Sequence, residues 1–402
     1  MIILRPEETK RIKESTKWTL VYGRRKTGKT FLVRQFVPYD EYFFVKTNKS
    51  ILDKENVSIS YEVFLEVLKR SLADGKTLVV DEFHRLGQDF FDMLHALKKQ
   101  GKLILISSTL FLSKKLLSSK SALLGLFAEA PIGLIRMRDA LHAIKDMHLS
   151  KKERLELALI MREPLAVDYL DEKKHPRELV ATVIARSLKT IPALVGEIFA
   201  EEAREISGVY EGILRAVALG KVTSGEISSS LFSKKLIAKD DPSIIQQYLN
   251  NLLSFGVLKR IEILNKKRFI YKHVSPLAKM YYYADEKYNL AERLVQEREV
   301  LPIVDELMPR LVEDNVREAL AEREGLRESI IEAADYDVDG CLLKFKKTEI
   351  ALEVKWKNID SSDILRSEEI LGKIDASRKI LFVPDKKGIT TALETMDVDD
   401  LL

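Results

Sequence analysis

Residues 23–30 have the types and spacing needed to bind a phosphate group. They read GRRKTGKT, which fits the phosphate-loop pattern G-x-x-x-x-G-K-[ST]. In such a loop, several backbone N–H groups and the N-terminus of a helix surround one anion. Lys29 would reach the β and γ phosphates of a nucleotide, and the Thr30 hydroxyl would ligate Mg²⁺. The predicted nucleotide contacts are Gly23, Arg24, Arg25, Lys26, Thr27, Gly28, Lys29, Thr30 and Phe31. Lys26 could instead be a solvated residue at the loop tip, and this alternative is favoured there.

A pair of acids follows the phosphate loop after about fifty residues. Thr77–Val80 is a β-branched and apolar run that ends at Asp81 and Glu82. Asp81 would hold Mg²⁺ through water, and Glu82 would act as general base on the attacking water. Such a run often marks only a strand end, but its place after a phosphate loop favours the catalytic interpretation. Ser108 ends the next apolar run and could read the γ-phosphate; alternatively it caps a turn.

A second group of chemically active residues lies near the C-terminus. Glu353 and Lys355 are two residues apart on a predicted strand, so both side chains point to one face. Asp339 precedes the neighbouring strand and could supply a second carboxylate for Mg²⁺. Glu313 would be the fourth member, and Asp337 competes with Asp339 for its role. This pattern is typical of PD-(D/E)xK nucleases. The alternative is an exposed surface ion pair between Glu353 and Lys355.

The elements that must position the first group alternate between strand and helix. Strands are predicted at residues 18–22, 41–46, 77–80 and 102–108, with helices at 30–36, 61–73 and 90–99. This alternation indicates a parallel sheet with helices on both faces. Ligands then bind at the carboxyl ends of the strands, where the loop and the acids lie. The predicted fold class is therefore α/β with a phosphate-loop NTPase core.

The rest of the chain changes character three times. We predict a phosphate-loop core over residues 1–135, a helical lid over 136–205, a winged-helix domain over 206–290 and a nuclease-like domain over 291–402. In the third unit, three short helices precede a hairpin of residues 257–264 and 268–273. The last unit is expected to begin with helices around 291–298 and 309–323. Its strands at 341–345 and 349–355 carry the carboxylate motif, in an α/β restriction-endonuclease-like arrangement.

The composition of the 402-residue chain sets limits on its partners. Lys and Arg total 66 against 62 Asp and Glu, so the net charge of +4 does not by itself indicate nucleic acid. The single cysteine, Cys341, fits a reducing, cytoplasmic compartment. No apolar run approaches about 18 residues, so no membrane span is expected. DNA is the predicted macromolecular partner because basic residues flank the winged-helix hairpin. They are Lys234, Lys235, Lys239, Lys259, Arg260, Lys266, Lys267 and Arg268. The alternative is a solvated basic face or a contact with another protein.

Nearly the whole chain resembles the archaeal AAA+/STAND-like ATPases that carry a C-terminal DUF234 region. The resemblance rests on the phosphate loop, Asp81-Glu82-Phe83, Ser107-Ser108, residues 115–125, Asp339 and Glu353–Trp356. It implies ATP and ADP as ligands with Mg²⁺, a possible homo-oligomer, and a winged-helix and nuclease-like tail. Two features depart from the family. Leu126-Phe127 follow Gly125 where arginines are expected, and the Gly-x-Pro lid motif is present only as Arg162-Glu163-Pro164, with Pro164 near the adenine.

The sequence therefore predicts an ATP-binding and ATP-hydrolysing enzyme of the AAA+/STAND type. Its nucleotide state would control DNA engagement through the last two domains. The alternative is a non-catalytic, nucleotide-dependent regulator or protein-interaction switch with a degenerate nuclease tail. Catalytic roles are assigned to Lys29, Glu82, Ser108, Asp339, Glu353 and Lys355, and metal-binding roles to Thr30, Asp81, Asp339 and Glu353.

Overall fold

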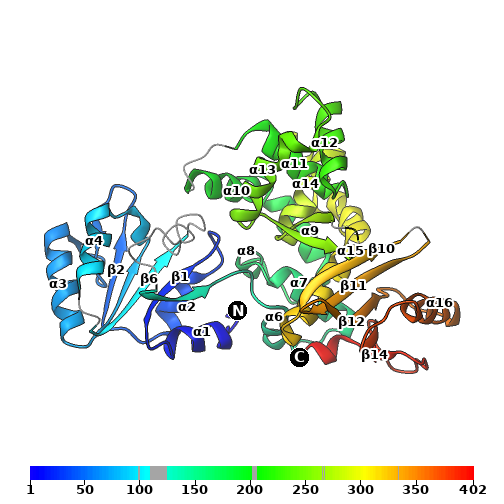
Figure 1. The fold of residues 1–402 in the computed structure, drawn as a ribbon, viewed down its shortest axis with the longest axis horizontal. Coiled ribbons are helices and arrows are strands. Elements are labelled where there is room, and N and C mark those ends of the chain that lie inside the picture. The colour runs from blue at the N-terminus through cyan, green and yellow to red at the C-terminus, as the bar shows by residue number, and fades with distance from the viewer. Residues whose placement is uncertain (98–99, 109–124, 202–205, 265, 267, 334) are drawn as a thin grey trace.

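The computed structural model covers residues 1–402 and describes all of them except 98–99, 109–124, 202–205, 265, 267 and 334. Two lobes are visible in Figure 1. The smaller lobe contains the N-terminal sheet, and the larger lobe contains the remaining helices and a second sheet. Both chain ends lie near the boundary between the lobes (Figure 1).

The N-terminal sheet has the order β4-β3-β2-β5-β6-β1-β7. Five neighbouring strands run parallel: β2, β5, β6, β1 and β7. The two short strands β3 and β4 pair antiparallel at one edge. The predicted parallel sheet is confirmed. Because β6 lies between β1 and β5, the strand ends that carry the phosphate loop and the acids are separated by one strand. The strands are β1 (Trp18–Tyr22), β2 (Glu41–Val45), β3 (Ile51–Leu52), β4 (Ser58–Ile59), β5 (Thr77–Asp81), β6 (Lys102–Ser107) and β7 (Phe127–Pro131).

Helices cover both faces of this sheet, as the alternating pattern predicts. Helices α1 (Pro6–Lys13) and α2 (Lys29–Phe36) pack on one face, and α3 (Tyr61–Ala73) and α4 (Gln88–Ala96) pack on the other. Phe64, Leu68 and Leu72 repeat at helical spacing, which places them on the buried side of α3. The Ser60 hydroxyl accepts a hydrogen bond from the Val63 N–H and caps the same helix.

The larger lobe begins with helices that share one core. They are α6 (Met137–Ala143), α7 (Lys151–Met161), α8 (Pro164–Val167), α9 (Pro176–Arg186), α10 (Thr190–Glu201), α11 (Gly208–Ala218), α12 (Ser224–Ser233), α13 (Pro242–Ser254) and α14 (Pro276–Tyr288). Within the described ranges, no single helix is long and apolar enough to cross a membrane. One pair bent by 62°, Pro176–Arg186 with Thr190–Ala200, reaches the required length and composition only when taken together.

The second sheet joins two parts of the chain that the sequence separates. Its order is β14-β13-β12-β11-β10-β8-β9. The hairpin of β8 (Leu258–Ile263) and β9 (Arg268–His273) pairs with the tail because β8 runs parallel to β10, with Ile263 beside Ile330. The hairpin predicted as a wing therefore forms the edge of the tail sheet. The remaining strands are β10 (Arg327–Glu332), β11 (Asp337–Lys344), β12 (Lys347–Val354), β13 (Arg378–Phe382) and β14 (Glu394–Met396).

One long helix, α15 (Glu297–Glu324), lies against one face of the second sheet, and α16 (Ser361–Gly372) lies against the other. The helix expected around residues 291–298 is wrong, because residues 290–292 form only a short 3₁₀ turn before α15 begins. Helix α15 also continues through Pro302 and Pro309. Val304, Met308, Leu311 and related apolar side chains are buried along its length, and this packing compensates for the hydrogen bonds that proline cannot donate.

Asp139 on α6 is expected to make the protein less stable as pH rises. Its side chain is buried, and its Oδ2 has no hydrogen-bond partner among the described residues. Burial, followed by the charge of Glu8, raises the pKa of Asp139 to about 6. Since the ordinary pKa is about 3.9, the favourable contribution of the protonated group is complete below pH ~4 and is lost as pH rises through the folded pKa.

Asp139→Asn should therefore raise the free energy of unfolding at pH 8 by roughly 1–3 kcal/mol. The same substitution should change it little at pH 4, where the carboxyl is neutral in both states. Denaturant unfolding at the two pH values measures the difference. An equal effect at both values would contradict the assigned ionisation.

Candidate nucleotide site and C-terminal carboxylate cluster

The phosphate loop connects the end of β1 to the start of α2. Gly28 is the N-cap of α2 and has φ 86°, a left-handed conformation that glycine adopts without strain. A side chain at Gly23 would place its Cβ only 2.0 Å from the Ile132 carbonyl oxygen. The two glycines of the pattern are thus required by the backbone, and the N–H groups at the start of α2 are free of capping side chains.

Side chains of the loop hold it in its folded form. The Lys29 Nζ donates to the Arg24 carbonyl oxygen at 2.8 Å, and the Thr27 hydroxyl donates to the same oxygen at 2.8 Å. Arg5 from the N-terminal segment donates to the Thr27 carbonyl oxygen at 2.9 Å. Lys29 is buried, so its ammonium group lies within the loop that would hold a phosphate.

Thr30 and Asp81 meet at the carboxyl edge of the sheet. The Thr30 hydroxyl donates to Asp81 Oδ2 at 2.7 Å, and the Tyr42 hydroxyl donates to the same oxygen at 2.8 Å. Burial raises the pKa of Asp81, while the hydrogen bonds from Thr30 and Tyr42 act in the opposite direction. Hydroxyl and carboxylate oxygens are ligands that Mg²⁺ prefers. The two residues predicted to hold Mg²⁺ are therefore adjacent in the structure.

Glu82 is held next to this pair in a strained backbone conformation. Its φ is 56°, which a non-glycine residue rarely adopts outside sites where the surrounding structure requires it. Ser108 donates to Glu82 Oε2 at 2.9 Å, and His84 Nδ1 and Arg85 Nη2 lie 3.4 Å and 3.8 Å from the same oxygen. Ser108 thus contacts the predicted general base directly. His84 and Arg85 were not among the predicted site residues.

An apolar cavity of about 220 Å³ opens beside the phosphate loop. It is lined by Thr27 and Gly28 from the loop, Phe31 from α2, and Pro164 from the start of α8. A Cβ at Gly28 would lie 3.9 Å from Pro164 Cγ. The N-terminal residues Met1, Ile2 and Ile3 form another wall. A cavity with apolar walls next to a phosphate loop suits a nucleotide base.

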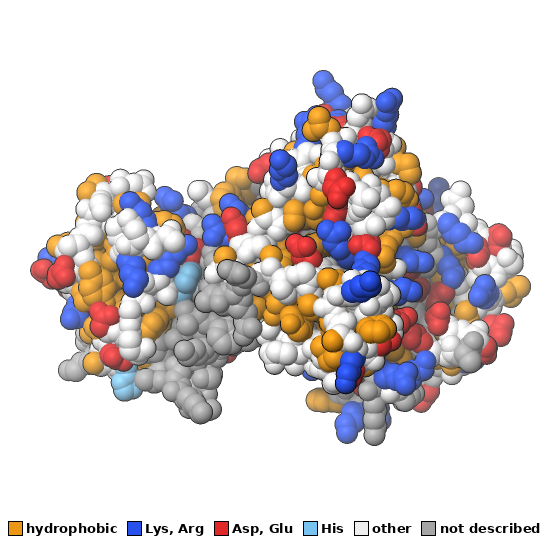
Figure 2. Space-filling model, turned by 90° about the horizontal axis from the view of Figure 1, so that it is seen from above, with side chains coloured by type: hydrophobic (Ala, Val, Ile, Leu, Met, Phe, Trp, Pro, Cys, Tyr) orange, Lys and Arg blue, Asp and Glu red, His pale blue; other side chains and the backbone are white. Residues whose placement is uncertain are grey.

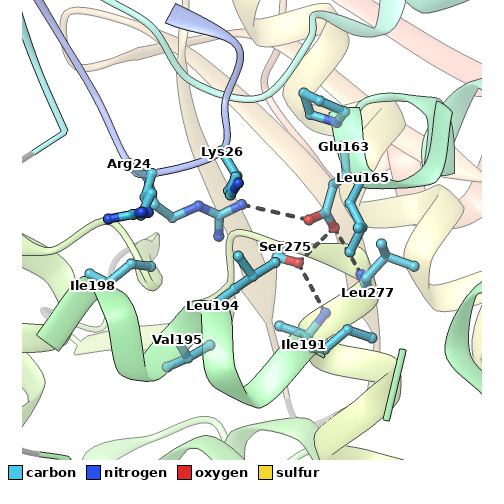
Figure 3. Close-up of a pocket in the computed structure, with 13 residues that line it drawn as sticks. Arg24, Lys26, Glu163, Leu165, Ile191, Leu194, Val195, Ile198, Ser275 and Leu277 are labelled. Carbon is cyan, nitrogen blue, oxygen red and sulfur yellow. Dashed lines mark hydrogen bonds and ion pairs between the residues drawn. The ribbon is translucent and has the colours of Figure 1, made fainter. Parts of the chain in front are cut away.

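A second cavity lies on the other side of the loop and is shown in Figure 3. Arg24 points across it to Glu163, with Arg24 Nη2 3.6 Å from Glu163 Oε2 (Figure 3). Glu163 Oε1 accepts hydrogen bonds from the Ser275 hydroxyl at 2.6 Å and from the Leu277 N–H at 3.0 Å. Arg25 pairs with Glu197 at 2.9 Å, whereas Lys26 is exposed. Arg24 and Arg25 of the loop therefore contact the larger lobe.

The predicted C-terminal residues come together at the edge of two paired strands. Gly340 lies opposite Leu352 in the antiparallel register, which makes Asp339 and Glu353 cross-strand neighbours. Asp339 Oδ2 accepts the Val354 N–H at 2.8 Å, and Lys355 Nζ lies 2.5 Å from Glu353 Oε1. Glu353 is 5% exposed, and its Oε2 has no hydrogen-bond partner in the described part of the chain. The ion pair considered above is therefore present, but the prediction that it is exposed is wrong, because Glu353 is buried.

Glu313 on α15 joins this carboxylate cluster of Glu313, Asp339 and Glu353. Burial, followed by the charge of Asp339, raises the pKa of Glu313 to about 7 and that of Glu353 to about 7. Burial also raises the pKa of Asp339, against the opposing effects of the Val354 N–H and Lys355. The charge of Asp339 thus raises the pKa of both glutamates, and a bound cation would relieve this repulsion.

Besides Lys355, two positive side chains lie near the cluster and bond mainly to carboxylates outside it. Arg317 is 2% exposed; it donates to the Asp339 carbonyl oxygen at 2.8 Å, to Asp314 at 2.9 Å and to Glu328 at 3.1 Å. Lys272 from β9 also bonds Asp314. Among the described residues, no group of three or more His, Cys, Asp or Glu side chains is arranged to hold a metal ion. A cation here would be held by two carboxylates, with water or substrate as further ligands.

The basic residues predicted to contact DNA divide into two sets. Lys259 pairs with Glu318 and Glu328, and Lys234 pairs with Glu286, so these cations are already neutralised. The others are exposed: Lys235, Lys239, Arg260, Lys266 and Arg268, with Lys267 outside the described residues. Figure 2 shows positive and negative side chains interspersed over the visible face. The surface in this view carries no single basic field.

Comparisons with known proteins agree with the N-terminal geometry. Residues 15–126 match the family described as AAA domain. This part of the chain carries the phosphate loop, and the match supports its similarity to the AAA domains of P-loop ATPases. The match covers the smaller lobe only. No curated protein matches the chain.

Several solved structures show a distant similarity. The Aeropyrum pernix ORC2 protein in its ADPNP-ADP complexes is 13% identical, with 76% of this chain and 90% of that chain covered at a TM-score of 0.37. The A. pernix ORC1 protein in complex with DNA is 14% identical, with coverages of 73% and 95% and a TM-score of 0.32. A STAND protein with a tetratricopeptide repeat sensor from Pyrococcus horikoshii is 13% identical, with coverages of 79% and 50% and a TM-score of 0.31. These TM-scores are too low to define a shared overall fold.

The structure brings together most of the predicted site residues and adds others. The phosphate-loop residues, Thr30, Asp81, Glu82 and Ser108 lie within one site, and Pro164 lines the cavity beside it. Of the family segment at 115–125, residues 115–124 lie outside the described residues. Sequence reasoning missed Tyr42, Arg85 and Met1–Ile3. Their positions depend on chain contacts that no local pattern encodes.

Proposed function

We propose that the protein binds and hydrolyses ATP with Mg²⁺ between its two lobes. The observation that carries this proposal is the hydrogen bond between Thr30 and Asp81. It lies beside a phosphate loop whose backbone requires glycine at positions 23 and 28. The base would occupy the apolar cavity lined by Phe31, Pro164 and the N-terminal residues. The triphosphate would lie along the loop, where Lys29 and the first N–H groups of α2 neutralise its charge.

Hydrolysis would use the residues at the ends of β5 and β6. Mg²⁺ held by Thr30 and Asp81 would neutralise charge on the β and γ phosphates. Glu82 would accept a proton from the attacking water as the oxygen of that water forms a bond to the γ-phosphorus. The bond between the γ-phosphorus and the oxygen that bridges it to the β-phosphate would break, and ADP and phosphate would leave. Ser108 and His84 contact Glu82 and would fix the direction of its carboxylate.

The second proposed activity is metal-dependent cleavage of a DNA phosphodiester at the carboxylate cluster. The buried Glu353 Oε2 that lacks a partner is the observation that favours it. A buried carboxylate oxygen without a hydrogen bond is costly unless a ligand completes it. Asp339 and Glu353 would hold Mg²⁺, which would polarise the phosphate, and Lys355 would stabilise charge on the phosphate oxygens. The exposed cations near the hairpin would contact the DNA backbone.

Cleavage is expected to depend on Glu353 and on metal. Glu353→Gln should lower the rate of metal-dependent cleavage of duplex DNA at least about 100-fold, because it removes one charged metal ligand. The rates should be measured with Mg²⁺ and with Mn²⁺, with chelator as the blank. Glu349→Gln on the same strand is the matched control and should leave the rate within about threefold.

If the wild type bound DNA in a salt-dependent way but cleaved it with neither Mg²⁺ nor Mn²⁺, the result would favour the non-catalytic regulator. The tail would then be degenerate, and the protein would act as a nucleotide-dependent regulator. No DNA binding at low salt would indicate a protein-interaction switch, because electrostatic affinity for DNA is greatest there.

A further inference from the structure

Three consecutive residues connect the nucleotide site to the rest of the molecule. Arg162, Glu163 and Pro164 lie between the end of α7 and the start of α8, and we refer to them as the joint. Arg162 and Glu163 are buried. Glu163 and Pro164 contact the phosphate loop, Glu163 also contacts the start of α14, and Arg162 contacts α15. Because neighbouring Cα atoms are fixed about 3.8 Å apart, these contacts cannot move independently.

Two residues of the joint face the nucleotide site. Pro164 lines the cavity proposed for the base and approaches the backbone of Gly28. Glu163 forms the ion pair with Arg24 of the phosphate loop, and its second oxygen accepts the Ser275 and Leu277 hydrogen bonds at the start of α14 (Figure 3). A movement of the phosphate loop would therefore alter the contacts of both Glu163 and Pro164.

The third residue contacts α15, the helix that carries Glu313 of the carboxylate cluster. The Arg162 guanidinium donates to Asn315 and Glu318 on α15, and its Nε donates to the Ile135 carbonyl oxygen at 3.0 Å. Asn315 is two residues beyond Glu313, which belongs to the cluster. Helix α14 provides a second route, because its Lys279 lies 3.4 Å from Asp314 on α15.

We propose that the joint transmits nucleotide occupancy to α15 and hence to the carboxylate cluster. The inference rests on the proposed nucleotide function and adds the regulation of the second site. It assigns Glu163 as a positioning residue, since it acts through Arg24 and α14 and does not touch reacting atoms.

The direction of the effect follows from charge. A triphosphate adds negative charge next to Arg24, so it competes with Glu163 for the guanidinium. A base in the cavity meets Pro164 at the same time. Nucleotide binding would therefore favour a conformation in which the pair between Arg24 and Glu163 is weakened, because a ligand shifts a conformational equilibrium toward the state that it binds more tightly. Weakening of the Arg24–Glu163 pair would let the joint move together with Arg162 and α15.

Amide hydrogen exchange with and without a saturating non-hydrolysable ATP analogue and Mg²⁺ tests the proposal in the full chain. The wild type should show a nucleotide-dependent change in exchange of about 5- to 150-fold for peptides that cover residues 275–280 and 311–320. Glu163→Gln keeps the shape of the side chain and removes its charge, so it should abolish most of this change. The matched control is Glu197→Gln, which removes the Arg25 partner on α10 and leaves the Arg24–Glu163 pair in place, and it should respond like the wild type.

Arg162→Gln provides a second variant, because it breaks the contact to α15 without altering the partner of Arg24. It should lose the response at residues 311–320 and keep the response at 275–280. Nucleotide saturation is verified by calorimetry in each sample. A saturated wild type with no change at 311–320, or a Glu163→Gln variant with the full change, would overturn this inference alone. Failure of the folded wild type to bind the analogue would overturn the proposed nucleotide function and this inference with it.

Discussion

Glu82→Gln is expected to retain ATP and to hydrolyse it about 10²- to 10⁴-fold more slowly than the wild type. The substitution preserves the shape of the side chain and its contact with Ser108, but an amide cannot accept the proton of the attacking water. Binding should remain close to that of the wild type, because the proposed phosphate contacts come from the loop and from Lys29. Single-turnover release of phosphate measures the rate, and calorimetry measures the binding.

A conservative control separates chemistry from folding. Glu62→Gln changes a carboxylate on α3, and it should leave both rate and affinity unchanged. If Glu82→Gln hydrolysed ATP at the wild-type rate, another group would have to act as the base. If it lost ATP binding, Glu82 would have a role in holding the nucleotide instead.

Arg317→Ala is expected to cause the largest loss of stability of any single substitution considered for this protein. Burial lowers the pKa of Arg317, but the charges of Asp314 and Glu328 outweigh it, so the guanidinium is firmly charged. Removal of this group leaves two carboxylates and the Asp339 carbonyl oxygen without their buried donor. Breaking a buried pair in this way costs about 3–5 kcal/mol. Denaturant unfolding measures the loss.

Arg323→Ala on the same helix is the matched control for Arg317→Ala. Arg323 forms a partly exposed pair with Glu324, so its removal should cost less than about 1 kcal/mol. Equal losses in the free energy of unfolding for the two variants would show that burial does not strengthen the ion pairs of Arg317. Unfolding of the larger lobe alone would be consistent with the position of Arg317 in that lobe.

The strands of the nucleotide site could be predicted because their signals are local. The run from Trp18 to Tyr22 and the run from Thr77 to Asp81 are buried on nearly every residue, as apolar parallel strands are. Chain order and right-handed crossovers then place their carboxyl ends at one edge. The contact of Thr30 with Asp81 follows from these two facts.

The start of α15 could not be read in the same way. Pro309 looked like the first residue of a helix, since proline is favoured at that position. The helix instead begins at Glu297 and passes through two prolines, because burial of its apolar side stabilises it more than the missing hydrogen bonds destabilise it. Tertiary packing overrides the local signal there.

Contacts between segments that are distant in the chain could not be predicted from the sequence either. The pairing of β8 with β10 joins Ile263 to Ile330, and no pattern in either strand specifies this partner. The same holds for Glu163, whose charge gives no sign that it pairs with Arg24 and caps α14. The sequence therefore indicated which residues do chemistry better than it indicated what holds them in place.

Calorimetric titration of the folded wild-type protein with ATP and Mg²⁺ tests the nucleotide site most directly. A saturable binding heat is expected, and Lys29→Ala should weaken the affinity about 100-fold or more, because one charged contact to the polyphosphate is lost. Lys26→Ala, at an exposed position of the same loop, should change the affinity less than about threefold. Absence of any binding heat from the intact, folded wild type would contradict the proposed site.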